Sequence, residues 1–135
     1  MGTQEKLQEA YTTLQAAVAR LGPMPLPQLG AELMPRFQPV PPEVLPPHQS
    51  VAVLASYLAP GFGLMPSHPV HKQLKMHLRH LILEGLQALE HASLICMHYE
   101  QGGIGYLNYL ATRRGLTALS EGTVEQKLWA NQPEV

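Results

Sequence analysis

The sequence has 135 residues, of which 45% are hydrophobic and 14% are charged, and its formal net charge at pH 7 is -1. A chain of this length can form one domain with a substantial core, and its near-neutral charge argues against nucleic-acid binding over a broad surface. It has no run of about 18 apolar residues, the length that a membrane-spanning helix needs. We therefore expect one soluble domain over residues 1–135 that does not cross a membrane.

The first predicted element is a helix over residues 1–22. Its apolar side chains recur at alternating intervals of four and three residues, at Leu7, Tyr11, Leu14, Val18 and Leu21. This spacing places them on one face of a helix. Gly22 and Pro23 end the pattern because neither continues a helix well.

Residues 23–47 contain nine of the thirteen prolines. Missing backbone donors and fixed φ angles exclude a long helix or a central strand there, although one short helical turn around Gln28 to Met34 is compatible with the sequence. Pro39 and Pro42 have the spacing of a polyproline II ligand. The segment also carries many large apolar residues, which a free ligand segment would not need. We therefore predict an extended strap that packs across the helices.

The remaining elements are also predicted to be helical. They are a short helix over residues 48–59, a long helix over 68–101 that starts at about Pro69, and short C-terminal helices over 104–130. No segment has the alternation of a strand. The predicted fold class is all-α: a small helical bundle around one long central helix (about 69–101), with the Pro-rich segment packed across it.

The long helix has apolar residues on two sides. If unbroken it would be about 50 Å long, whereas a compact domain of this size is only about 36 Å across. Gly85, with the small Ala88 and Ala92, would let another helix approach closely. These features favour a homodimer, although the chain's own helices could instead cover both sides. The predicted interface consists of Leu83, Leu86, Leu94, Met97, Tyr106 and Tyr109.

A polar ribbon follows the same helix. It comprises His77, His80, Glu84, Gln87, His91 and His98, which share one side of the predicted helix. His77, His80 and Glu84 are candidate metal ligands, but a closed zinc site usually needs four ligands, and no second cluster completes one. We therefore expect neither a metal nor a cofactor, and a His-rich metal-binding protein is the least favoured alternative.

A basic patch offers a different function. Lys72, Lys75 and Arg79 share one side of the first turns, and with Arg113 and Arg114 they are candidate contacts for phosphates. Histidine protonation in mildly acidic conditions would strengthen the patch. Such residues are more often an ordinary solvated surface, and no nucleic-acid-binding motif supports the interpretation. A nucleic-acid-binding accessory protein is therefore the alternative hypothesis.

The sequence contains little that indicates catalysis. The stretch GGIG at residues 102–105 follows a predicted helix instead of opening a strand-to-helix turn, and Ser93 lacks the surroundings of a nucleophile elbow. The single Cys96 excludes an intramolecular disulfide, and its apolar neighbours predict a buried thiol. The favoured hypothesis is a non-enzymatic cytoplasmic adaptor or assembly module that binds a second copy of itself and another protein.

Overall fold

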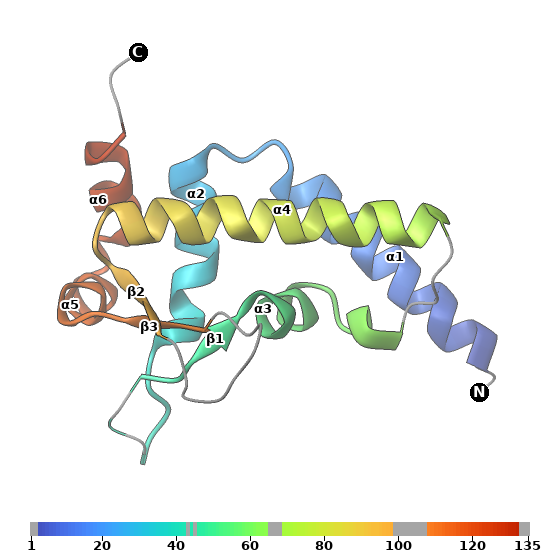
Figure 1. The fold of residues 1–135 in the computed structure, drawn as a ribbon, viewed down its shortest axis with the longest axis horizontal. Coiled ribbons are helices and arrows are strands. Elements are labelled where there is room, and N and C mark those ends of the chain that lie inside the picture. The colour runs from blue at the N-terminus through green and yellow to red at the C-terminus, as the bar shows by residue number, and fades with distance from the viewer. Residues whose placement is uncertain (1–2, 43, 45, 65–68, 99–107, 133–135) are drawn as a thin grey trace.

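The computed structural model describes residues 3–42, 44, 46–64, 69–98 and 108–132 (Figure 1). As predicted, this part of the chain is mainly helical, and none of its helices combines the length and apolar character that crossing a membrane requires. The α-helices are α1 (Thr3–Leu21), α2 (Leu26–Leu33), α3 (Val51–Leu58), α4 (Pro69–His91), α5 (Arg113–Glu121) and α6 (Val124–Ala130). Two 3-10 helices are η1 (Met34–Phe37) and η2 (Phe62–Leu64), and the strands are β1 (Gln49–Ser50), β2 (Ile95–His98) and β3 (Asn108–Ala111).

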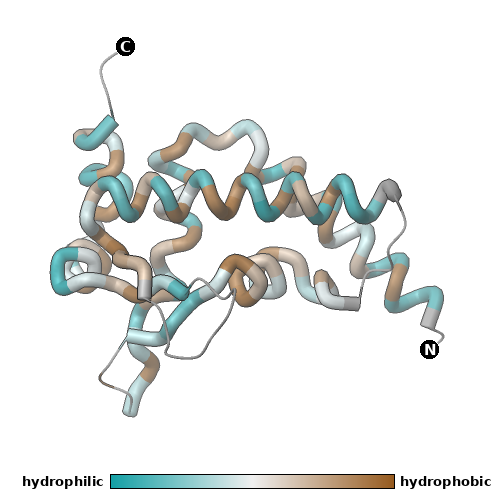
Figure 2. The backbone as a smooth tube through the Cα atoms, in the orientation of Figure 1, coloured by the Kyte–Doolittle hydropathy of each residue, from teal (hydrophilic) through white to brown (hydrophobic). Residues whose placement is uncertain are grey.

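Helix α4 organises the molecule. It runs along much of the longest axis, and α1, α2 and α3 each pack against it (Figure 1). Figure 2 shows hydrophobic and hydrophilic residues alternating in short groups along α4, the pattern of a helix with one buried face. The largest fully buried side chains of the core come from α1, α2, η1, α3, α4 and the turn after α4: Leu14, Leu21, Leu29, Leu33, Met34, Phe37, Leu54, Leu78, Ile82, Leu86, Leu89 and Leu94.

Two glycines let α2 pack closely against its neighbours, Gly85 at the contact with α4 and Gly30 at the contact with α6. A Cβ atom added to Gly85 would lie 2.7 Å from Leu33 Cδ1, and one added to Gly30 would lie 2.8 Å from Leu128 Cδ1. Both distances are shorter than a real Cβ allows, so an alanine at either position would require the leucine side chain opposite it to move. The sequence predicts a close helix approach at Gly85, and the helix that approaches there is α2 of the same chain.

The Pro-rich segment is partly helical instead of forming an extended strap throughout. Pro25 precedes α2 and Pro27 lies in its first turn, where a missing N–H costs no hydrogen bond. The segment then buries Leu29, Leu33, Met34 and Phe37 completely. Only its second half is extended among the described residues, and there Val40 and Val44 are exposed. The prediction of a packed strap is thus wrong for this second half.

The long helix ends at His91 and not near residue 101. The Leu94 N–H donates to the Leu89 carbonyl (3.0 Å) and the Ser93 N–H to the Glu90 carbonyl (2.9 Å). Ser93 has a φ of 63°. Together these features form a Schellman motif, which closes a helix C-terminus with a left-handed residue that is usually glycine. At 23 residues α4 is about 34 Å long, so it fits within a compact domain and need not project.

The structure also contains a small sheet, although the sequence predicts no strand. Among the described residues the strands have the order β1-β3-β2, and both pairs are antiparallel. Tyr109 of β3 is paired with Gln49 of β1 and with Met97 of β2. The segments over which a helix was predicted, up to residue 101 and again from residue 104, therefore include β2 and β3. The strands are at most four residues long, too short for a clear alternation of apolar residues.

Helix α5 is fixed to the turn after α4. Thr112 caps it by accepting a hydrogen bond from the Gly115 N–H (3.0 Å), and the Thr112 hydroxyl donates to the Ser93 carbonyl (2.7 Å). The Thr112 N–H donates to the Leu94 carbonyl (3.0 Å). A Cβ atom at Gly115 would clash with that same carbonyl oxygen. Only glycine therefore allows α5 to start this close to the core.

Candidate interaction surface

The outer face of α4 is the side that no other described element covers. Its exposed residues are Gln73, Met76, His77, His80, Leu83, Gln87 and His91. Met76 and Leu83 lie two turns apart on it and are 48% and 42% exposed, although both are large and apolar. The series 73, 76, 80, 83 and 87 has intervals of three and four residues, the spacing that two paired helices use for their contact line. This line forms an unpartnered seam along the helix.

The predicted interface residues separate into two groups. Leu83 and Met97 are exposed, at 42% and 37%. Leu86, Leu94 and Tyr109 lie in the chain's own core, so the prediction that they form an exposed second face is wrong. The prediction places Leu83 and Met97 on one face of a continuous helix, but α4 ends at His91 and Met97 belongs to β2. Tyr106 lies outside the described residues.

The polar ribbon is shorter than the sequence predicts. His77, His80, Glu84 and His91 are exposed on α4, whereas His98 belongs to β2. No group of three metal-ligating side chains in the described part of the chain is close enough to hold a metal ion. The candidate ligands His77, His80 and Glu84 instead lie along the outer face and its edge, and the ribbon continues into a cavity.

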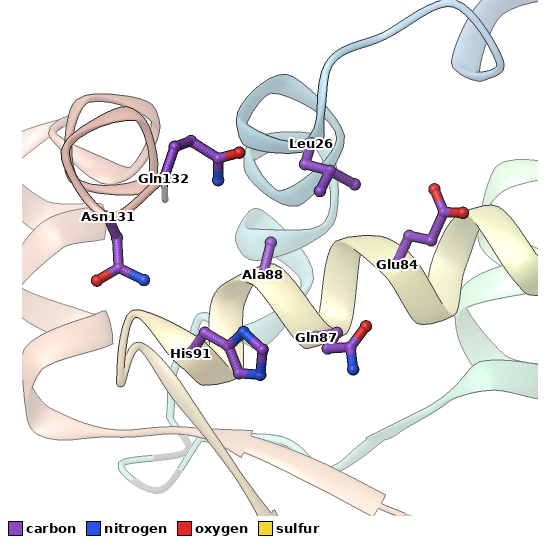
Figure 3. Close-up of a pocket in the computed structure, with 7 residues that line it drawn as sticks. All are labelled: Leu26, Glu84, Gln87, Ala88, His91, Asn131 and Gln132. Atoms are coloured by element: carbon purple, nitrogen blue, oxygen red, sulfur yellow. The ribbon is translucent and has the colours of Figure 1, made fainter. Parts of the chain in front are cut away.

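This cavity lies beside the C-terminal half of the outer face and has a volume of about 480 Å³ (Figure 3). It lies between α4, the start of α2 and the residues that follow α6. In Figure 3 the side chains of Leu26 and Gln132 lie on one side of Ala88, and those of Gln87 and His91 lie on the other. The lining residues are Leu26, Glu84, Gln87, Ala88, His91, Asn131 and Gln132. Sequence reasoning could not find this site, because Asn131 and Gln132 come from the far end of the chain.

The fold separates the residues of the predicted basic patch into two groups, one on α4 and one at the start of α5. The Lys75 Nζ lies 4.7 Å and the Arg79 Cζ 5.4 Å from the ring centroid of Phe62, which is buried in η2. Lys72 is exposed one turn earlier. Arg113 and Arg114 begin α5, which lies near the opposite end of α4 (Figure 1). The two groups of cations therefore do not form one patch.

Cys96 is exposed, which corrects the prediction of a buried thiol. It occupies the second position of β2, directly after the buried Ile95. Side chains alternate between the two faces of a strand, so burial of Ile95 directs Cys96 to the other face. Apolar neighbours predict burial in a helix core but not in an edge strand.

Comparison with protein-family models, with curated proteins and with solved structures gives no match for this chain. We therefore infer its function from the outer face of α4 and from the cavity beside it.

Proposed function

We propose that this chain is a non-enzymatic protein–protein interaction module that acts inside the cell as a homodimer, with the outer face of α4 as the contact. The observation that carries the proposal is the exposure of Met76 and Leu83 on one seam. Large apolar side chains at seven-residue spacing on a helix surface are typical of helix pairing. A second copy of α4 would remove both from water.

The charge distribution on this face also favours self-association. The seam carries glutamine and histidine besides its two apolar residues, so it has no fixed charge where two copies would meet. The whole chain has a formal charge of only -1, so two copies repel each other weakly. The fixed charges of the face lie at its edges, where Lys72 and Arg79 are on one side and Glu84 is on the other.

An intracellular location is part of the proposal. The exposed Cys96 is an unpaired thiol. Exposed thiols persist in reducing compartments and become oxidised in secreted proteins, where cysteines usually form disulfides. Nucleic-acid binding is less well supported, because Lys72, Lys75 and Arg79 on α4 lie far from Arg113 and Arg114 at the start of α5 (Figure 1).

Sedimentation equilibrium tests the dimer. We expect Met76→Glu and Leu83→Glu each to weaken self-association by about tenfold or more, since a charge would replace an apolar anchor at the centre of the contact. Val53→Glu is the matched control: Val53 lies on α3 and has the same 48% exposure as Met76. A monomer at tens of micromolar, or an equal effect of Val53→Glu, would contradict the proposal.

A further inference from the structure

We propose that the two α4 helices of the dimer run in the same direction, and that the cavity beside Glu84 receives the Arg79 guanidinium of the partner subunit. This inference rests on the proposed dimer and adds its direction, its register and an occupant for the cavity. It is carried by two separate observations, the chemistry of the cavity and the positions of the charges along α4.

The cavity has the chemistry of a guanidinium site. Its polar lining side chains provide oxygen acceptors: the carboxylate of Glu84 and the amide oxygens of Gln87, Asn131 and Gln132. No lysine or arginine is among the seven described lining residues, and Glu84 carries the one formal charge when histidine is counted as neutral, so the cavity has a formal charge of -1. A guanidinium carries five N–H donors in one plane, which suits several oxygen acceptors better than a compact ammonium does.

The apolar part of the lining fits the rest of the same side chain. Leu26 is 40% exposed and Ala88 forms the α4 surface next to it. An arginine side chain has an apolar stem behind its charged head, and such stems lie along apolar surface while the head reaches polar groups. The cavity thus offers both surfaces that an arginine side chain needs.

The positions of the charges indicate which arginine enters. Arg79 directly precedes the seam residue His80, and Glu84 directly follows the seam residue Leu83. When two helices pair in the same direction, a residue on one edge of the seam meets the residue five positions later on the other edge of the partner helix. Arg79 of each copy is then next to Glu84 of the partner subunit, twice in a symmetric dimer.

Pairing in opposite directions would place like edges together. The edge that carries Lys72 and Arg79 would then face its own copy, and Glu84 would have no cation opposite it. Like charges across an interface cost binding energy, whereas complementary edges select a direction. The charge pattern therefore favours parallel helices.

Arg79 is prepared for such a contact within its own chain. Its guanidinium lies over the Phe62 ring with the Cζ 5.4 Å from the centroid. Stacking on an aromatic face restrains a guanidinium and leaves the N–H groups at its edge free to donate. The ion pair of the described residues is Arg20–Glu32 at 3.0 Å, and neither Arg79 nor Glu84 has an ion-pair partner there.

A charge-swap experiment tests the contact by sedimentation equilibrium at low salt. We expect Arg79→Glu and Glu84→Arg each to weaken the dimer about tenfold, and the double variant to return to within about twofold of the original affinity. Glu121→Arg is the control, since it changes the charge equally but lies at the end of α5. A double variant as weak as the single variants, or an Arg79→Glu variant that dimerises normally, would overturn the inference.

Cross-linking in a Cys96→Ser background tests the direction independently. Residues 73 and 87 are about 21 Å apart along α4, much farther than a disulfide can bridge. With oxidised glutathione, a parallel dimer of the Gln73→Cys variant should form a disulfide between the two residues 73, and a parallel dimer of the Gln87→Cys variant should form one between the two residues 87. Links that form only between Gln73→Cys and Gln87→Cys chains would show opposite directions, which overturns this inference but leaves the dimer. Absence of any dimer would contradict both proposals.

Discussion

The inner and outer faces of α4 both contain leucine, but the leucines of the two faces have different environments. Leu86 on the inner face is fully buried, whereas Leu83, less than one turn away, is 42% exposed. The difference arises from what lies opposite each residue and not from its hydrophobicity. The inner face packs against α1, α2 and α3, while no described element covers the outer face. A leucine on a helix therefore becomes part of a core only where the rest of the chain reaches it.

The largest expected effect comes from placing a charge on each face in turn. We expect Leu86→Glu to lower the free energy of unfolding by about 4 kcal/mol or more, because a buried carboxylate would have no partner. Leu83→Glu should change it by less than about 0.5 kcal/mol at concentrations where the chain is monomeric. Urea titration followed by circular dichroism measures both. Equal destabilisation by the two substitutions would refute the distinction between the faces.

A second prediction concerns the point where α5 meets the turn after α4. We expect Gly115→Ala to destabilise the fold by about 3 kcal/mol, because its methyl group would clash with the Leu94 carbonyl, and backbone cannot rotate away as a side chain can. Gly63→Ala is the matched control, since no atom lies within 4 Å of a Cβ there. Thermal unfolding of the two variants gives the comparison, and a stable Gly115→Ala variant would argue against this packing.

The crossing of α2 and α4 predicts a smaller effect. Gly85→Ala should cost about 1 kcal/mol net, because the overlap with Leu33 Cδ1 outweighs a gain of about 1 kcal/mol in helix propensity. In a Leu33→Ala background the obstructing methyl group is absent, so the same substitution should become favourable. Unfolding free energies of the four variants form a double-mutant cycle. Additive effects within it would mean that Gly85 is not in contact with Leu33.

The sequence pattern of α4 shows how much of the fold could be predicted: its periodicity is visible in the sequence, and its end is not. The periodicity of apolar residues predicts a helix at the positions of α1 and α4, since it depends only on local spacing. It cannot predict the end of α4, because Ser93 takes a left-handed conformation that sequence rules assign mainly to glycine. Because α4 ends at His91, Leu94 and Met97 are not on a helix face, and the helical spacing that groups them with Leu83 and Leu86 does not apply.

The candidate site was only partly predictable for a related reason. The polar ribbon indicated that His77, His80 and Glu84 share one side of α4, which is a local property. The cavity depends on Leu26 from the Pro-rich segment and on Asn131, which are more than one hundred residues apart. A contact between such distant segments leaves no periodic signal in the sequence. Only the folded chain brings these side chains to Glu84.

The smallest expected effect concerns Ser93, the left-handed residue of the turn that ends α4. A left-handed conformation costs a residue with a Cβ about 1–2 kcal/mol, whereas glycine adopts it readily but loses more conformational freedom on folding. The Ser93 carbonyl that accepts from Thr112 is backbone and would remain. We therefore expect Ser93→Gly to stabilise the fold by about 0.5 kcal/mol, and Ser93→Val to destabilise it because a β-branched residue tolerates this conformation poorly. Chemical denaturation of both variants tests the pair. If Ser93→Val were as stable as Ser93→Gly, residue 93 would not be left-handed, and α4 would lose the structural reason for ending there.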